Sequence, residues 1–238
     1  MTEDDPAYPA ASLILMRDRR AGAPELLIVQ RSASLVFAAG AYVFPGGRVD
    51  PIDQELARRF CPALEPGDGA ARVAAVRETQ EETAISVALS PVPEAGSAAF
   101  ANPAVRLDCD ALVPFARWLP KESVKRRFDT RFYLAEAEGE AIPVADGVET
   151  ETAFWATAED LLARCARSDG RAIFPTRRLL ERLARFACFA EARAEAERLP
   201  QRIITPWVER RAQGDWLRIP DDAGYPVTGE PVETAMRY

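Results

Sequence analysis

The sequence contains no histidine among its 238 residues. This absence excludes Ser-His-Asp and Cys-His catalysis, zinc bound by histidine, and proton transfer through an imidazole. Acid–base chemistry in this protein must therefore come from carboxylates, lysine, tyrosine, cysteine or water bound to a metal ion.

Cysteine is also scarce. No two of the cysteines form a C-x-x-C pair, and their spacing matches no zinc motif. We therefore expect free, mostly buried thiols in a reducing cytosol. The four are Cys61, Cys109, Cys165 and Cys188.

The chain has no apolar run near the roughly 20 residues that a membrane span needs. Its first residues, MTEDDPAYPA, lack the basic and apolar regions of a signal peptide, so we expect a cytoplasmic protein that does not enter a membrane. The formal net charge is −7, and an acidic surface does not attract nucleic acid. A phosphate-bearing substrate would need local arginine, lysine or bound metal to offset this repulsion.

Short apolar runs and helical periodicity alternate along the chain and predict an α/β fold, with a mixed sheet covered by helices on both faces. The length favours one domain with elaborations, which we place at residues 8–200, followed by an extension at 201–238 packed on it. Strands are expected at 11–16, 25–31, 42–44, 112–119, 128–135 and 152–156. Helices are expected at 51–61, 70–83, 158–167 and 176–198.

Four charged residues, Arg77, Glu78, Glu81 and Glu82, lie toward the end of the expected helix at 70–83. Spacings of three and four residues put the three glutamates on one helix face, where they repel one another. A cation such as Mg²⁺ reverses this repulsion, because it prefers oxygen ligands and bridges substrate phosphates. A solvated acidic face is the ordinary alternative, since charged helix faces are common.

A tight turn, Pro45-Gly46-Gly47, precedes this helix and favours the metal site. Glycine lets the backbone approach a ligand closely, so carbonyls of the turn can complete a metal shell. Arg77, four residues before Glu81, can orient or neutralise a carboxylate when metal is absent.

These residues resemble the Nudix signature, GX5EX7REUXEEXGU, in which U is a bulky aliphatic residue. Gly47 matches the first glycine, residues 77–82 match the charged positions of REUXEE, and Ile85 matches the last aliphatic position. Asp53 stands where the pattern has glutamate. The resemblance implies an α/β/α sandwich and water attack on a diphosphate that joins a nucleoside to another group.

The resemblance also implies the ligand set for Mg²⁺ or Mn²⁺: the side chains of Glu78, Glu81 and Glu82, and a carbonyl of the Gly-Gly turn, which we assign to Gly46. With no histidine available, Glu81 or Glu82 is the expected general base. We place both of them, with Arg77, in the catalytic set.

A more distant glutamate, Glu149 or Glu151, is an alternative base, although ordinary polar loop residues explain both. Five arginines are candidate phosphate partners, because a planar guanidinium suits oxyanions. Surface ion pairs would explain each of them taken alone. The five are Arg31, which ends a strand near the expected site, and Arg48, Arg126, Arg127 and Arg131.

Besides Asp53, the box departs from the pattern in three places. Gly47 and Arg77 are 30 positions apart here, against 14 in the pattern, so 16 residues are inserted, roughly Gln54 to Gly69. We expect this insert to hold a short helix and a loop. Thr79 replaces an aliphatic residue, and Ala84 replaces the glycine that ends the helix. If that position needs a positive φ, alanine costs on the order of 1 kcal/mol.

The interrupted box, together with PGGRVDPID, RETQEET, FDTRFYL and FPTRR, resembles one branch of the family. That branch contains mammalian acyl-CoA diphosphatases of peroxisomes and mitochondria and their bacterial relatives. The resemblance covers roughly residues 10–190 and implies cleavage of CoA or acyl-CoA into 3′,5′-ADP and a 4′-phosphopantetheine product.

Other functions stay open at this point. The same chemistry could act on ADP-ribose, NADH, a dinucleotide or a nucleotide sugar. A non-catalytic module that binds a nucleotide is an alternative of another class, because a fold alone does not fix function; loss of the glutamates would favour it, and all three are present. Relatives often dimerise, so a homodimer is possible.

Overall fold

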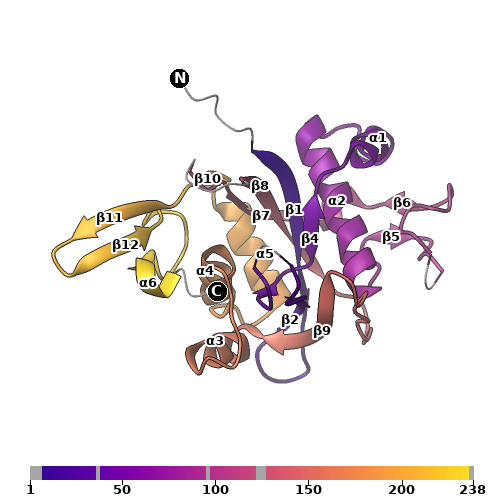
Figure 1. Cartoon of the computed structure of the whole chain (residues 1–238). Coiled ribbons are helices and arrows are strands. Elements are labelled where there is room, and N and C mark those ends of the chain that lie inside the picture. The colour runs from indigo at the N-terminus through magenta and orange to yellow at the C-terminus, as the bar shows by residue number, and fades with distance from the viewer. Residues whose placement is uncertain (1–6, 36–37, 95–96, 122–126, 236–238) are drawn as a thin grey trace.

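The computed structural model describes residues 7–35, 38–94, 97–121 and 127–235. Its centre is a mixed eight-stranded sheet with helices on both faces, which confirms the predicted fold class (Figure 1). The strands follow the order β10-β7-β8-β1-β2-β3, and β4 and β9 pair with β1 and β2. They are β1 (Tyr8–Arg17), β2 (Glu25–Arg31), β3 (Tyr42–Val43), β4 (Gly46–Arg48), β7 (Val113–Trp118), β8 (Phe128–Glu136), β9 (Thr150–Thr157) and β10 (Ile203–Ile204).

The long strand β1 organises the sheet. It runs parallel to β8 along its length, pairs with β4 through residues 10–12, and pairs with β2 through Met16 and Arg17. Because β4 and β2 share different parts of β1, the sheet divides between them.

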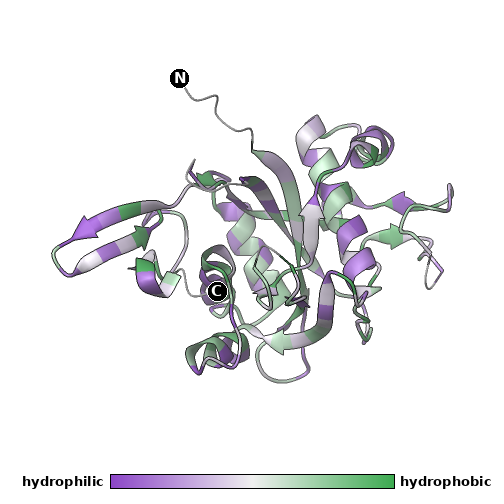
Figure 2. Ribbon diagram, viewed as in Figure 1, coloured by the Kyte–Doolittle hydropathy of each residue, from purple (hydrophilic) through white to green (hydrophobic). Residues whose placement is uncertain are grey.

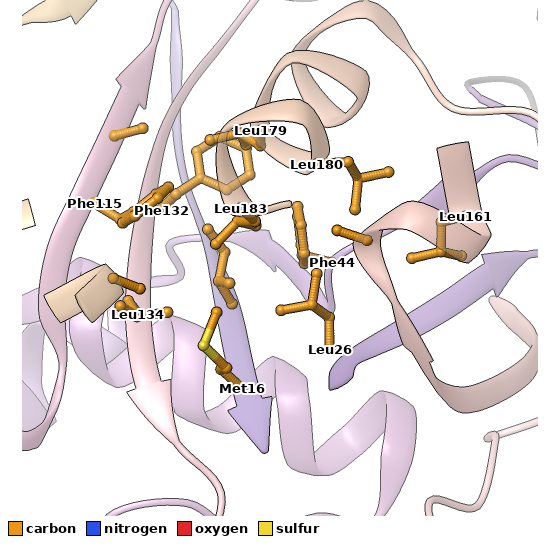
Figure 3. Close-up of a cluster of buried hydrophobic side chains, with 14 of the residues drawn as sticks. Met16, Leu26, Phe44, Phe115, Phe132, Leu134, Leu161, Leu179, Leu180 and Leu183 are labelled. Atoms are coloured by element: carbon orange, nitrogen blue, oxygen red, sulfur yellow. The ribbon is translucent and has the colours of Figure 1, made fainter. Parts of the chain in front are cut away.

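The two faces of the sheet carry separate cores. Helices α1 (Pro51–Phe60) and α2 (Pro66–Thr83) cover one face, where Ala11, Leu13 and Leu15 of β1 pack against the alanine and valine side of α2. Helices α3 (Ala158–Ala166), α4 (Phe174–Leu183) and α5 (Phe189–Arg198) cover the other face. Figure 3 shows that second core, with leucines of α4 against Met16, Phe132 and Leu134 of the sheet.

The C-terminal residues add a small three-stranded sheet, β11 (Trp207–Arg211), β12 (Gly214–Arg218) and β13 (Gly229–Pro231), followed by α6 (Val232–Ala235). Its hairpin projects from the body (Figure 1) and carries many polar residues (Figure 2). Two contacts join the segment to the body: the buried Trp118 indole N–H of β7 donates to the Tyr225 hydroxyl at 3.0 Å, and Arg177 of α4 pairs with Glu230 at 2.8 Å. No helix in the described ranges is long and apolar enough to cross a membrane.

Two helix predictions need correction. Helix α2 begins at Pro66 and not at residue 70, because the Glu65 side chain accepts hydrogen bonds from the backbone N–H groups of Gly67 and Asp68, both at 2.9 Å. The single helix predicted at 176–198 is two helices, α4 and α5. The break is stabilised by Asp18, whose carboxylate accepts from the Phe189 N–H at the start of α5 at 2.8 Å.

The expectation of free thiols is wrong for two of the four cysteines. Cys61, at the end of α1, forms a disulfide with Cys109 in the short helix η1 (Cys109–Ala111), with Cα atoms 6.1 Å apart. Cys165 and Cys188 are free. The remaining segments, β5 (Leu89–Ser90) and β6 (Arg106–Leu107), form a two-stranded sheet of their own.

Candidate active site

The candidate site forms where β4 passes over the last turns of α2. The Gly46 N–H donates a hydrogen bond to the Glu82 carboxylate at 2.9 Å. Gly47 lies against the Glu78 carboxylate so closely that a Cβ at this position would overlap it, and a Cβ on Gly46 would overlap the backbone of β1. Glycine is therefore required at Gly46, because the backbone of β1 cannot move aside, whereas glycine at Gly47 leaves the Glu78 carboxylate in its present place.

Arg77 lies at the centre of the charged cluster. Its Nε and Nη2 bind both carboxylate oxygens of Asp53 at 2.9 Å, and Nη2 also donates to the Arg48 carbonyl at 3.1 Å. Its Nη1 donates to Glu78 at 2.9 Å and to Glu81 at 2.8 Å. The predicted i, i+4 pair of Arg77 and Glu81 is thus present, and the guanidinium fixes the carboxylates of Asp53, Glu78 and Glu81 by hydrogen bonds.

Burial sets the protonation of two of the glutamates. Glu82 is only 4% exposed, and burial raises its pKa to about 8 against the opposing hydrogen bond from Gly46. Burial also raises the pKa of Glu78 to about 7, although Arg77 opposes the shift. The negative charge of Glu81 adds to the shift of the Glu78 pKa, and the charges of Glu78 and Glu149 add to the shift of the Glu82 pKa. This part of the site is therefore short of positive charge.

The donor set suits a hard divalent cation, because it consists of carboxylate and backbone oxygens. In the described part of the chain, no three acidic side chains lie close enough together to enclose an ion as they stand. The reason is visible in the contacts: Arg77 draws Glu78 and Glu81 toward itself, while Glu82 turns to the Gly46 N–H. Binding an ion would require these side chains to change partners.

The end of α2 shows how the departures from the Nudix pattern are accommodated. Ala84 adopts the left-handed conformation, with φ of 58°, so this position does need a positive φ. Thr79 is fully buried in place of the aliphatic residue, and its hydroxyl donates to the Ala75 carbonyl one turn earlier at 2.7 Å. That bond satisfies the buried hydroxyl within the helix.

The predicted phosphate partners fall in different places. Arg31 faces Glu82, since its charge lowers the pKa of that carboxylate. Arg48 is exposed at the end of β4 beside the site, and Arg127 follows the same edge, where its carbonyl accepts from the N–H of Tyr8 at 2.8 Å. Arg126 lies outside the described residues.

Arg131 is not brought to the glutamates. It pairs with Asp68 at 3.1 Å, in the first turn of α2. Glu82 lies near the other end of that helix, about 20 Å away along its axis at 1.5 Å per residue. Arg131 therefore stabilises the start of the helix, with Tyr133, whose hydroxyl donates to Asp68 at 2.8 Å.

Two further residues belong to the site. Asp53 is fully buried and accepts hydrogen bonds from Nε and Nη2 of Arg77. In the sequence, Asp53 was noted only as the replacement for a glutamate of the box, and its pairing with Arg77 was not predicted. Glu149, considered only as a distant base, faces Glu82 closely enough to raise its pKa. It is exposed beside the start of β9, whereas no contact among the described residues brings Glu151 to the cluster.

Comparison with known proteins gives the family. A model of the NUDIX domain matches residues 7–176, and the chain therefore belongs to the Nudix family of hydrolases. The crystal structure of a NUDIX hydrolase from Alicyclobacillus acidocaldarius has a TM-score of 0.69 and 27% identity, and the match covers 79% of this chain and 96% of that one. Nudix hydrolases generally use divalent metal ions.

Two more distant structures also match. The NUDIX domain of Shewanella oneidensis NrtR, solved with ADP ribose, has a TM-score of 0.48 and 16% identity over 76% of this chain and 88% of that one. The MutT protein from Methanosarcina mazei Go1 has a TM-score of 0.47 and 16% identity, and the match covers 78% of this chain and 97% of that one.

Proposed function

We propose that this protein hydrolyses a diphosphate linkage in a nucleoside diphosphate derivative with the help of Mg²⁺ or Mn²⁺. The observation that carries the proposal is the pair of glutamates held against Gly46 and Gly47, the partly buried Glu78 and the buried Glu82, both with raised pKa values. A site short of positive charge at a strand end where backbone and carboxylate oxygens meet suits a divalent cation.

In this proposal the metal would be held by Glu78, Glu81, Glu82 and the Gly46 carbonyl. When bound, it would neutralise the diphosphate and lower the pKa of a coordinated water. Arg77 is a positioning residue, because its contacts go to Asp53 and the glutamates. Glu81 is half exposed and is the most accessible of the three as a general base, while Arg31 faces the site and is suited to a substrate phosphate.

CoA or acyl-CoA is the substrate that we propose. Its support is the interrupted box, in which most of α1 and the first turn of α2 occupy the expected insert at residues 54–69. The diphosphate of CoA would be cleaved to 3′,5′-ADP and a 4′-phosphopantetheine product.

Metal removal and one substitution test the reaction. We expect no activity in EDTA and recovery on adding Mg²⁺ or Mn²⁺. Glu82→Gln should reduce turnover well over ~100-fold with folding retained, whereas Glu197→Gln, an exposed glutamate of α5, should leave turnover unchanged. Full activity in EDTA, or near wild-type turnover of Glu82→Gln, would contradict the mechanism.

A substrate panel tests the CoA assignment separately. Mass spectrometry should detect 3′,5′-ADP from CoA and acyl-CoA, and no cleavage of ADP-ribose, NADH or dinucleoside polyphosphates. Cleavage of ADP-ribose alone would overturn the CoA assignment and leave the diphosphate chemistry standing.

A further inference from the structure

The first halves of the central strands β1 and β8 are less buried than their second halves. Helices α3, α4 and α5 cover the second half of β1 and β8, where Ile14, Met16 and Leu134 are fully buried. On the same face, the first halves of these central strands are only partly buried at Tyr8, Ser12, Phe128 and Thr130. Two of those four side chains are aromatic and three carry hydroxyls, which makes this exposed end suitable for a ligand that is partly flat and partly polar.

The two aromatic residues and an arginine form one cluster on this face. Tyr8 and Phe128 are register partners on the parallel strands β1 and β8, and their ring centroids lie 6.1 Å apart. The Arg48 guanidinium carbon lies 4.5 Å from the centroid of the Tyr8 ring. Arg48 itself is exposed, so the cluster is open to solvent on at least one side.

This cluster is continuous with the candidate active site. Ser12 pairs with Gly46, whose N–H binds Glu82, and Ala10 pairs with Arg48 on the same short strand β4. The Arg48 carbonyl also accepts from Arg77. Tyr8 lies roughly 13 Å along β1 from Ser12 at 3.3 Å per residue, a span that a ribose and base attached to a diphosphate at Glu82 would bridge.

We propose that Tyr8 and Phe128, with Arg48, form the subsite that stacks against the nucleobase of the substrate. The inference rests on the proposed function, because it takes the diphosphate to lie at Glu82. Aromatic rings bind the flat face of any base, and a guanidinium adds an attraction to a ring face. The two rings are tilted at 44° to each other, so a base would stack on one ring and contact the other, and the hydroxyls of Ser12 and Thr130 would lie on the path toward the diphosphate.

Binding of two ligands that differ only by the base tests this subsite without turnover. Isothermal titration calorimetry would compare AMP with ribose 5-phosphate in the metal-free protein. We expect the wild type to bind AMP about ten-fold more tightly, within the range for one stacked base. Tyr8→Leu should abolish this preference, and Tyr8→Phe, which keeps the ring, should retain it; thermal unfolding would verify that both variants fold.

The outcomes separate this inference from the proposed function. Equal binding of the two ligands by the wild type, or an unchanged AMP preference in Tyr8→Leu, would overturn the stacking subsite even if diphosphate hydrolysis is observed. If Tyr8→Leu weakens both ligands equally, Arg48 and its neighbours bind the phosphate rather than the base, which also overturns it. A Tyr8-dependent preference in a protein that cleaves no diphosphate would support the subsite while the proposed reaction fails.

Discussion

Ala84 ends helix α2 in the left-handed conformation, two residues after Glu82, and we predict that Ala84→Gly stabilises the protein. The left-handed region costs an L-residue with a Cβ roughly 1–2 kcal/mol. Glycine removes that strain but loses roughly 0.5–1 kcal/mol more backbone entropy on folding. Ala84 is exposed and has φ of 58°, so little side-chain packing is lost. The net gain should be about 0.5–1 kcal/mol.

Thermal and urea unfolding followed by circular dichroism would measure this gain, which corresponds to a rise in Tm of roughly 1–4 °C in a chain of this size. Ala194→Gly is the matched control, because Ala194 is exposed within α5 in ordinary helical conformation. The control should lose about 1 kcal/mol. A lower Tm for Ala84→Gly, parallel to the control, would show that the left-handed alanine carries no strain.

Three further substitutions test what holds the site's surroundings together. Asp53→Asn should lower the free energy of unfolding by about 3 kcal/mol, because it breaks the buried ion pair with Arg77. The control is Asp50→Asn: Asp50 is half exposed and lies 3.8 Å from the same arginine, so the loss should be under about 1 kcal/mol. Equal losses of the two variants in urea titrations would refute this difference. Burial acts to raise the pKa of Asp68, but hydrogen bonds from an arginine and a tyrosine outweigh it and hold that pKa below 3.8. The carboxylate's stabilisation is therefore present above that value and lost as pH falls through the lower folded pKa, so Asp68→Asn should lower stability at pH 7 and much less at pH 2, compared by urea unfolding at both pH values. Cys61→Ala should lower stability by about 2–4 kcal/mol, since the disulfide to Cys109 closes a loop spanning 48 residues, and a reductant should lower the Tm of the wild type but not that of the variant.

Much of the framework followed from local patterns. Apolar runs predicted the main strands because each is buried on at least one face, and the charged hexamer placed three glutamates on one helix because helical spacing is fixed. The glycine position of the box at Ala84 raised a positive φ only as a condition, and the structure shows that the condition holds. These features depend on residues within one or two turns of each other.

The features that the sequence did not predict depend on contacts between distant segments. The break between α4 and α5 is stabilised by Asp18, which lies 171 residues away in the chain, so an Ala-rich stretch favoured one long helix. The disulfide joins two cysteines of unremarkable spacing. Arg131 resembled a phosphate partner because its charge is visible in the sequence, whereas Asp68, which neutralises it, is brought near only by the fold.

The Asp53–Arg77 pair explains how the box can be interrupted without losing its charged cluster. The two residues flank the insert, 24 positions apart, and meet through two hydrogen bonds of 2.9 Å. The disulfide between Cys61 and Cys109 fixes the insert just after the C-terminal end of α1. Helix α1 is therefore held at both ends, by a covalent bond and by a buried ion pair. Because Arg77 also binds Glu78, displacement of Asp53 is one route by which a change in the insert can reach the glutamates, and substitutions on the exposed face of α1 should leave the site intact.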